Sequence, residues 1–574
     1  MLSSWKNFWA VVISILAGFS VVWGCELVKV FSPAPPRENE PSLSESALVR
    51  YHFSRALLEI SQGKLLEAEK DLKTSLKHQP DSAYLHFKLA QVYARQGNYH
   101  LCEQETEKAI ELEPEWKEPY QFLTAVYLYQ NQLSKAEKSA RQILKLDPED
   151  EKAIIYLARS YQLRGLKELA LVRLRKYLDK YPQKSQVLRE YAQMLLEMGR
   201  LSEAKQAYEQ LLDQTPGDYE SWLDYAEILA SLKDFSSALS VYQQIIKIFP
   251  NQPYPRLEEI KLLLHLRKFE TAENKLELAK KLFPEQVDFW EISGWLKLSQ
   301  NQLEQAKREY QTVLELSPSH SEALFRLGWI FYQEENYSQA EKYFSQISKS
   351  SQLYPQAQAQ LVWTIYQQGK KEQAFELANK LVEEHPGKKI FWLNLAELYQ
   401  KEELYQQAKD TLEKAMTHIP EDADLFYSLA MVYSLMGNYQ KGIELAQTAL
   451  KLKPDDPFIL NFIGYSWAEQ GRNLKQAEEY LRKALEKAPE NGAIIDSLGW
   501  VYYQKGQYQK ALKLLQEANQ KFPEDPEIVK HIGQVWLKLG NPEKARFWLK
   551  KALELNPRTQ LKKEIEKLLK ELEK

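Results

Sequence analysis

Three tryptophans recur at a fixed interval in the second half of the chain. Trp295, Trp329 and Trp363 each lie 34 residues apart. An exposed indole ring buries a large area at a small entropic cost and keeps one polar N–H, which suits an extended peptide or a sugar chain. The complete set of candidate ligand-binding residues is Trp295, Phe325, Trp329, Tyr332, Trp363, Tyr366, Tyr465, Trp500 and Tyr503. The alternative is that these rings fill gaps between neighbouring helices.

Catalytic and metal-binding motifs do not accompany these rings in the sequence. The nine histidines are scattered, with no H-E-x-x-H spacing, and there is no Cys-x-x-Cys. No phosphate-binding glycine loop and no G-x-S-x-G elbow occurs either. We therefore expect no enzyme activity, no catalytic residue, no metal site and no cofactor. The net charge of -3 gives no support to a nucleic-acid partner.

The N-terminal residues 1–30 differ from all that follows. Lys6 precedes a 19-residue uncharged run, Asn7 to Cys25, long enough for a signal-peptide core or a membrane-spanning helix. The run ends in Val-Trp-Gly-Cys, which resembles the lipobox of bacterial lipoproteins. That resemblance implies cleavage before Cys25 and lipidation of its thiol. Because Val and Trp replace the usual leucine and small residue, an uncleaved anchor remains the alternative, and a buried soluble helix is a third.

Both membrane interpretations place the rest of the chain on the same side. Lys6 and the terminal amine favour a cytoplasmic N-terminus, which leaves the remainder in the periplasm or outside the cell. Residues 31–46 hold four prolines among serines and glutamates. Such a segment cannot bury a core and stays extended. We expect it to be a tether.

A proline every 34 residues defines the elements that must position the aromatic rings. These prolines are Pro80, Pro114, Pro148, Pro182, Pro216, Pro250, Pro284 and Pro318, followed by Pro386, Pro420, Pro454, Pro489, Pro523 and Pro557. With proline as repeat position 32, apolar and small residues fall at positions 4, 7, 8 and 11, then at 20, 24 and 27. Each group predicts one helix. Position 15, often Gly or Asn, predicts the turn between them, and proline ends the second helix.

This pattern resembles the tetratricopeptide repeat (TPR). Position 20 is alanine in thirteen of fifteen repeats and Cys102 or Gly442 in the others, so the two helices of a pair can approach closely. The resemblance implies an all-α fold, a right-handed α-solenoid of about fifteen helix pairs over residues 47–559. Residues 560–574 form one charged helix with an apolar face, which we expect to cap the last pair. Dimerisation through that helix is the alternative.

In the TPR family, positions 2, 5, 9 and 12 of the first helix line the concave groove. The three tryptophans at the fixed interval occupy position 9, and so do Tyr465 and Trp500. TPR clamps that bind chaperone tails carry Lys at position 5 and Asn at position 9. Here those positions hold Phe53 and Leu57 in the first repeat, then Phe87 and Gln91 in the second. We therefore expect no carboxylate clamp at the N-terminal end.

One further resemblance bears on function. The segments Gly464–Trp467 and Asp496–Trp500 look like stretches of bacterial envelope TPR lipoproteins. Members of that group are adaptors for periplasmic proteases, pilus assembly or polysaccharide export. We expect a membrane-tethered scaffold of the bacterial cell envelope that binds a protein or peptide in its groove, in envelope assembly or proteolysis. The alternatives are a glycan-binding scaffold of a polysaccharide export or cell-wall machine, and an assembly piece with no groove ligand.

Overall fold

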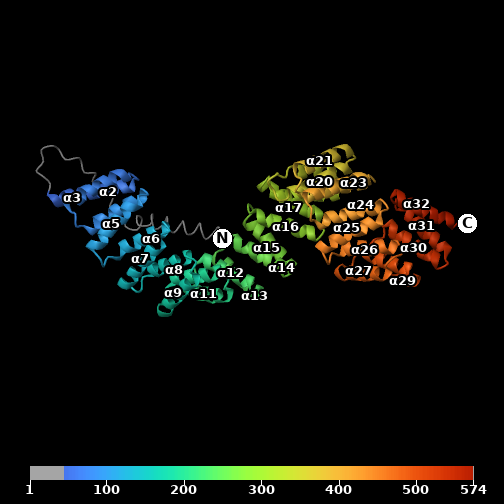
Figure 1. Ribbon diagram of the computed structural model, residues 1–574. Coiled ribbons are helices and arrows are strands. Elements are labelled where there is room, and N and C mark those ends of the chain that lie inside the picture. Colours follow the sequence, from blue (N-terminus) through green and yellow to red (C-terminus); the bar gives the residue numbers. More distant parts are fainter. Residues whose placement is uncertain (1–43, 573–574) are drawn as a thin grey trace. The chain divides into compact units, whose positions relative to one another are not determined.

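The computed structural model describes residues 44–572. The anchor or signal segment, Cys25 and most of the tether lie outside these residues. The described part contains 31 α-helices and no strand, and its helices form fifteen successive antiparallel pairs and one final helix (Figure 1). The pairs belong to two compact units that divide after Pro284. None of the described helices combines the length and apolarity needed to cross a bilayer.

The first unit holds seven helix pairs. Their bounds are α2 Glu45–Ser61, α3 Leu65–His78, α4 Ala83–Arg95, α5 Tyr99–Leu112, α6 Lys117–Tyr129, α7 Leu133–Leu146, α8 Glu151–Leu163, α9 Lys167–Lys180, α10 Ser185–Glu197, α11 Leu201–Gln214, α12 Tyr219–Ser231, α13 Phe235–Ile248, α14 Tyr254–His265 and α15 Phe269–Leu282. Helix α2 begins at Glu45, so Glu45 and Ser46 are helical and not part of an extended tether.

The second unit holds eight pairs and the final helix. Their bounds are α16 Val287–Ser299, α17 Leu303–Leu316, α18 Ser321–Gln333, α19 Tyr337–Ser345, α20 Tyr354–Gln367, α21 Lys371–Glu384, α22 Lys389–Lys401, α23 Tyr405–His418, α24 Ala423–Leu435, α25 Tyr439–Leu452, α26 Pro457–Glu469, α27 Leu474–Lys487, α28 Gly492–Gln504, α29 Tyr508–Lys521, α30 Pro526–Lys538, α31 Pro542–Glu554 and α32 Thr559–Glu571.

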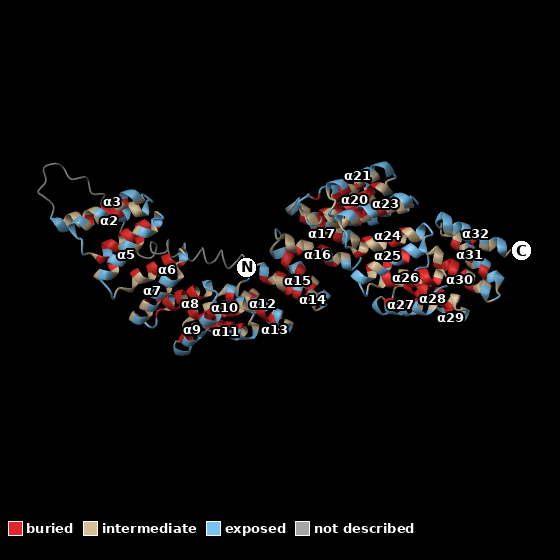
Figure 2. Ribbon diagram, viewed as in Figure 1, coloured by how far each residue is buried: buried red, intermediate tan, exposed pale blue. Residues whose placement is uncertain are grey.

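Small residues set the distance between the helices of each pair. All thirteen alanines at position 20 are fully buried, and so is Cys102. Glycine at position 8 meets a large side chain at position 24: a Cβ on Gly328 would lie 2.7 Å from the Phe344 ring, and one on Gly294 would lie 2.8 Å from the Tyr310 ring. The close packing of each hairpin therefore depends on these side chains being absent or minimal. Figure 2 shows the buried residues between the helices.

Position 15 has a positive φ in every one of the fifteen repeats. Nine of these residues are glycine and two are asparagine, and the remaining four are Lys233, Arg267, Glu335 and Glu403. This left-handed residue ends the first helix and reverses the chain, which confirms the predicted turn. The one-residue insertion in the turn after α26 is absorbed by a second left-handed residue, Asn473.

The repeat that lacks proline departs from the others. Helix α19 has nine residues, whereas the second helices of most other repeats have fourteen. An irregular segment, residues 346–353, then leads to α20, which begins one residue before Pro355. The next repeat keeps its register, but α19 is shorter than most other second helices by more than one helical turn.

Four junctions between successive repeats share one polar contact. A tyrosine hydroxyl from position 11 of a first helix donates to a glutamate at position 21 of the preceding second helix. The four O–O distances are 3.3 Å for Tyr93–Glu69, 2.6 Å for Tyr127–Glu103, 3.0 Å for Tyr161–Glu137 and 2.6 Å for Tyr502–Glu478. Hydrogen bonds to an ionised acceptor are stronger than neutral ones, so these contacts help to hold neighbouring pairs in register.

The Glu478 contact predicts a loss of stability in acid. Burial opposes ionisation of this carboxyl, but hydrogen bonds from Lys505, Tyr502 and Arg482 outweigh it and lower the pKa from 4.5 to about 2. The lowered pKa stabilises the fold above pH 4.5, and this stabilisation is lost as the pH falls toward 2. Glu478→Gln is expected to remove about 1–2 kcal/mol of that pH-dependent stability, measured by urea unfolding at pH 7 and pH 3.

The control for this prediction is the neighbouring residue Glu479, which is exposed and forms an ordinary surface ion pair with Lys483. Glu479→Gln is expected to leave the pH dependence as it is in the unaltered protein. If Glu478→Gln also leaves it unchanged, the contact does not stabilise the junction.

The final helix covers the end of the second unit. Ile565 is fully buried and lies in a cluster with Val529, Leu549 and Ala552 of the last pair. Leu561, Leu568, Leu569 and Leu572 pack around that cluster. The apolar face of α32 therefore closes the core that the last pair would otherwise leave open, as expected for a capping helix.

Candidate ligand groove

Two tryptophans are exposed on successive first helices of the second unit. Trp295 of α16 is 44 % exposed and Trp329 of α18 is 37 % exposed. Trp363, the corresponding residue of α20, is partly buried, and its ring meets Tyr366 edge-on at 5.6 Å. Single exposed apolar side chains are common, but two exposed tryptophans at one repeat position of successive first helices make this strip the candidate ligand surface.

The other aromatic residues of this group contact neighbouring rings. Phe325 meets Phe344 edge-on at 5.7 Å, and Tyr332 meets Tyr337 at 5.4 Å. Phe325 and Tyr332 pack, together with Trp363 and Tyr366, against one hydrophobic cluster that contains Phe344. The rings of Phe325 and Tyr332 therefore help to hold α18, the helix that carries Trp329.

Charged side chains flank the exposed rings. Arg326 pairs with Glu322 at 2.7 Å, and His320 lies 3.6 Å from Glu291. At the far end of the strip the Tyr366 hydroxyl donates to Glu402, whose carboxylate also accepts from Lys371 at 2.6 Å.

These carboxylates differ in how readily they ionise. Hydrogen bonds from Lys371 and Tyr366 lower the pKa of Glu402. Burial instead raises the pKa of Glu397, which occupies position 9 of the next first helix, α22. The strip thus combines flat apolar rings with several carboxylates, which suits a segment carrying aliphatic or aromatic side chains and some positive charge.

The second predicted aromatic patch is a packed cluster. Trp500 is only 4 % exposed, so its assignment to an open strip is wrong for the structure described here. Its ring lies between Tyr503, at 4.4 Å, and His531, at 4.1 Å, both nearly parallel to it. Tyr465 is partly buried and donates its hydroxyl to Glu527 at 2.6 Å, and burial raises its pKa well above 10.

Trp500 is buried because the first helices near the C-terminus lie close together. The Tyr465–Glu527 hydrogen bond joins α26 to α30, two repeats further on, so the concave side is closed over Trp500. His531, fully buried and 3.0 Å from Asp496, completes the cover. Sequence reasoning missed His531 because position 6 does not belong to the groove strip.

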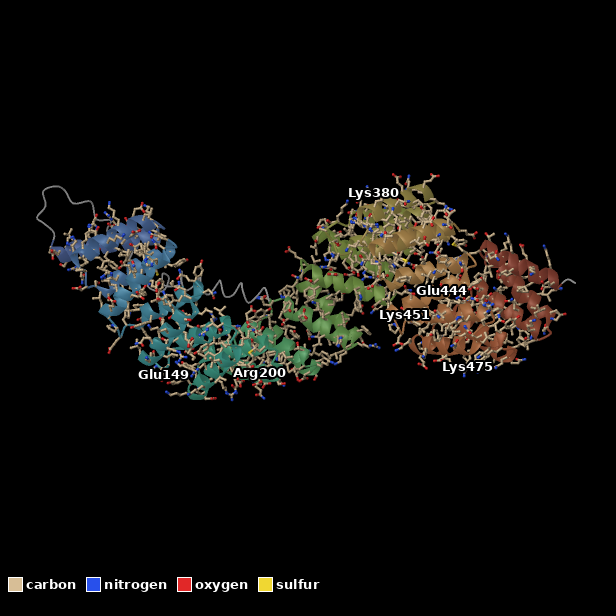
Figure 3. All side chains as sticks on the ribbon, in the orientation of Figure 1. Glu149, Arg200, Lys380, Glu444, Lys451 and Lys475 are labelled. Atoms are coloured by element: carbon tan, nitrogen blue, oxygen red, sulfur yellow. The ribbon has the colours of Figure 1, made fainter. Side chains whose placement is uncertain are left out.

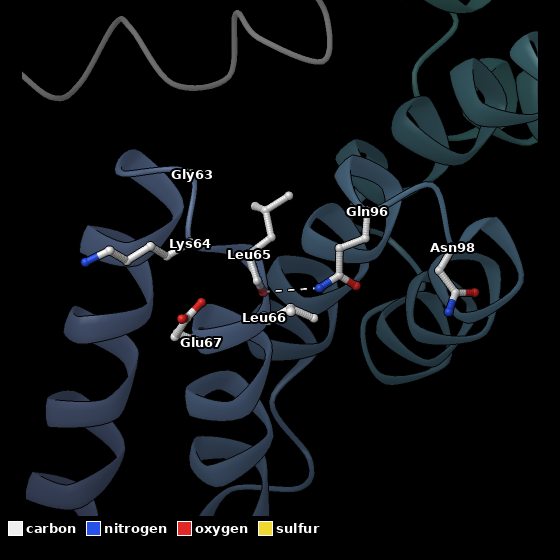
Figure 4. Close-up of a pocket in the computed structure, with 7 residues that line it drawn as sticks. All are labelled: Gly63, Lys64, Leu65, Leu66, Glu67, Gln96 and Asn98. Atoms are coloured by element: carbon white, nitrogen blue, oxygen red, sulfur yellow. Dashed lines mark hydrogen bonds between the residues drawn. The ribbon is translucent and has the colours of Figure 1, made fainter.

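An open depression lies at the N-terminal end of the first unit (Figure 4). It measures about 540 Å³ and lies between the first two turns, with Leu66 and Glu67 on one side and Gln96 and Asn98 on the other. Gln96 donates to the Leu65 carbonyl at 3.2 Å and to Glu69, and Asn98 caps α5, so the polar groups are engaged in structure. Among residues 44–572, no group of three or more His, Cys, Asp or Glu is placed to hold a metal ion.

Hairpins of this geometry define a class, the α-solenoid scaffolds. Tetratricopeptide repeat models match residues 83–116, 152–184, 195–254, 293–357, 393–457, 427–492 and 502–563. Together the matches span more than half of the chain. The chain belongs to the tetratricopeptide repeat family, whose repeats serve as scaffolds for protein interaction.

The curated relatives match this chain over part of its length. The chain is similar to the TPR repeat-containing protein PA4667 of Pseudomonas aeruginosa, with 26% identity over 24% of this chain and 23% of the relative. It is also similar to anaphase-promoting complex subunit CDC16 of Saccharomyces cerevisiae, with 25% identity over 25% of this chain and 17% of the relative. The chain thus spans less than a quarter of the length of these curated relatives.

Two solved structures are similar to this chain at low sequence identity. The Cut9–Hcn1 hetero-tetramer of the APC/C matches with 16% identity over 81% of this chain and 98% of that chain, with a TM-score of 0.37. A tetratricopeptide repeat protein of Parabacteroides merdae matches with 17% identity over 43% of this chain and 98% of that chain, with a TM-score of 0.36.

Proposed function

We propose that this protein is a membrane-tethered adaptor that holds a segment of a partner protein against Trp295 and Trp329. The observation that supports the proposal is the exposure of these two rings on successive first helices of one compact unit. A peptide laid along the strip would cover both rings. Binding of this kind concentrates its energy in a few aromatic anchors.

The proposed setting is the bacterial cell envelope, with the repeats on the periplasmic or outer side. Residues 1–30 would tether the chain through the uncharged run, with or without lipidation of Cys25. An adaptor held at a membrane raises the local concentration of its guest, which suits envelope assembly or proteolysis.

The proposal predicts that the tryptophans are binding residues with little structural role. A photo-reactive phenylalanine in place of Trp363, between the rings and the next repeat, is expected to capture a polypeptide from envelope extracts. Trp295→Ala with Trp329→Ala is expected to reduce that capture by roughly thirtyfold or more, because an aromatic anchor contributes about 2 kcal/mol or more. The measurement is the yield of crosslinked product identified by mass spectrometry.

The matched control is Phe547→Ala, which removes an exposed ring from α31, outside the strip. It is expected to leave the capture unchanged. If the probe captures a saccharide and no polypeptide, the glycan-binding alternative replaces the proposal. If the double variant captures as much as the unaltered protein, the rings do not bind the partner.

A further inference from the structure

The α8–α9 hairpin of the first unit exposes four aliphatic side chains in a row. Leu163, Leu166, Leu169 and Val172 are 47, 42, 36 and 60 % exposed. Leu163 ends α8 and Leu166 lies in the turn, while Leu169 and Val172 lie three residues apart on one side of α9. These four neighbouring residues are called the stripe. Two half-exposed leucines at a turn are ordinary, but four neighbouring aliphatic residues form an apolar surface with no partner among the described residues.

The same repeat positions are polar on both sides of this hairpin. Where α9 has Leu169 and Val172 at positions 19 and 22, α7 has Lys135 and Lys138, and α11 has Glu203 and Gln206. The hairpin core needs nothing apolar there, because neighbouring repeats pack without it. The exposed stripe is therefore a special feature of this hairpin and not a requirement of the repeat.

The stripe lies in the most basic part of the first unit. Helices α7 and α9, whose buried faces share one hydrophobic cluster, carry nine basic residues and only three acidic ones, although the whole chain has a net charge of -3. The nine basic residues are Lys135, Lys138, Arg141, Lys145, Lys167, Arg173, Arg175, Lys176 and Lys180. Figure 3 shows Glu149 and Arg200, which lie near this region, at the outer edge of the ribbon.

The three acidic residues are each paired with an arginine. Glu137 pairs with Arg141 at 2.9 Å, Asp179 with Arg175 at 3.2 Å and Glu168 with Arg200 at 3.1 Å. Within the described part of the chain, no acidic side chain lies within 4 Å of Lys138, Lys145 or Lys176. Lys176 and Lys180 continue the stripe directly beyond Val172, at four-residue spacing on the same face of α9. A row of aliphatic groups is thus followed by two lysine amines, of which that of Lys176 has no acidic partner and that of Lys180 lies over the Tyr181 ring.

We propose that the outer face of α7 and α9, with the stripe from Leu163 to Val172, docks on an anionic lipid bilayer. Aliphatic side chains of an amphipathic helix enter the boundary between headgroups and acyl chains, while lysines extend their amines to anionic headgroups. Anionic surfaces attract each nearby lysine, and the attraction falls off within a Debye length. The arrangement of this face matches both requirements.

A protein or a nucleic acid fits the face less well. Four aliphatic side chains, each between 36 and 60 % exposed, offer far less area than the roughly 800 Å² that each partner buries in a stable protein interface. A nucleic acid would use the lysines but would leave the aliphatic stripe in water, because base recognition relies on aromatic stacking and hydrogen bonds. A bilayer satisfies the stripe and the charges together.

The test places a photo-reactive phenylalanine at position 172 of the full chain and mixes the protein with vesicles. Vesicles of 30 % phosphatidylglycerol in phosphatidylcholine, a composition chosen to supply about one anionic lipid in three, are compared with pure phosphatidylcholine. Lipid adducts at position 172 are expected on the anionic vesicles, with several-fold less on the zwitterionic ones and less again in high salt. The matched control is the same probe at Gln206, the corresponding exposed position of α11, where no adduct is expected.

Two variants separate the contributions. Each lysine near an anionic surface contributes about fivefold to docking, so Lys138→Gln with Lys176→Gln is expected to lower the adduct yield by roughly tenfold or more. Leu169→Gln tests the stripe with a residue that five other repeats of this chain carry at position 19, namely Gln305, Gln339, Gln373, Gln407 and Gln476. Leu169→Gln is expected to lower the yield of lipid adducts and to leave the helix content, measured by circular dichroism, unchanged.

Equal yields on the two kinds of vesicle, or equal yields at positions 172 and 206, overturn the proposal. So does capture of a protein or nucleic acid from extract by a probe that captures no lipid. The inference does not rest on the peptide groove, because Trp295 and Trp329 belong to the other unit. Their alanine variants are expected to leave the lipid adducts unchanged.

Discussion

Replacing Trp500 with alanine is expected to lower the free energy of unfolding by about 3–5 kcal/mol, the range for deleting a buried tryptophan. The ring is 4 % exposed and stacked between Tyr503 and His531, so its removal leaves a cavity and uncovers the His531–Asp496 pair. The loss should be local, because the repeats of a solenoid mainly contact their neighbours. Hydrogen exchange of α28 and α30, together with the urea midpoint, measures it.

The same substitution at Trp329 is the control. Because Trp329 is 37 % exposed and does not lie inside the core, Trp329→Ala is expected to cost less than about 1 kcal/mol. The pair of variants therefore distinguishes a core ring from a binding ring at one repeat position. Equal losses at the two sites would contradict the distinction between the two aromatic groups.

Replacing Ala340 with leucine is expected to destabilise the α18–α19 hairpin by about 1–3 kcal/mol. Ala340 is fully buried, and the neighbouring contact of Gly328 with Phe344 shows that the two helices already touch. Three extra heavy atoms can be accommodated only if the helices separate. A lower melting temperature and faster hydrogen exchange in α18 and α19 would report this separation.

Ala493→Leu supplies the control for overpacking, since Ala493 is exposed on α28 and the same atoms would extend into water. It is expected to change the free energy of unfolding by less than about 0.5 kcal/mol. An Ala340→Leu variant as stable as the unaltered protein would mean that position 20 does not set the helix spacing.

The repeat architecture could be predicted from the sequence because each of its determinants is local. Proline at position 32, the small residue at position 20 and the turn residue at position 15 each act within one hairpin, and each recurs often enough to be recognised. Even Lys233 and Glu403, poor residues for a positive φ, follow the turn geometry because the flanking helices impose it.

The candidate site could be predicted only in part, since the exposure of a ring depends on neighbouring repeats. Trp329 and Trp500 occupy the same repeat position and cannot be told apart by periodicity. What separates them is the approach of α26 to α30, which places Tyr465 within reach of Glu527. That approach results from many small angles between pairs, which no single repeat encodes. The sequence did not predict the stripe from Leu163 to Val172 because repeat positions 19 and 22 do not face the groove.

The shortened helix α19 has a consequence for how this molecule fails under load. A solenoid is held together mainly by contacts between adjacent hairpins, so its resistance to heat or tension is limited by its weakest repeat. With nine residues where most second helices have fourteen, α19 has fewer helical hydrogen bonds of its own, and the irregular residues 346–353 follow it. Unravelling should therefore begin at residues 337–353, between Trp329 and Trp363. A guest held against Trp295 and Trp329 would then lose its support at Trp329 early, while more distant hairpins are still intact.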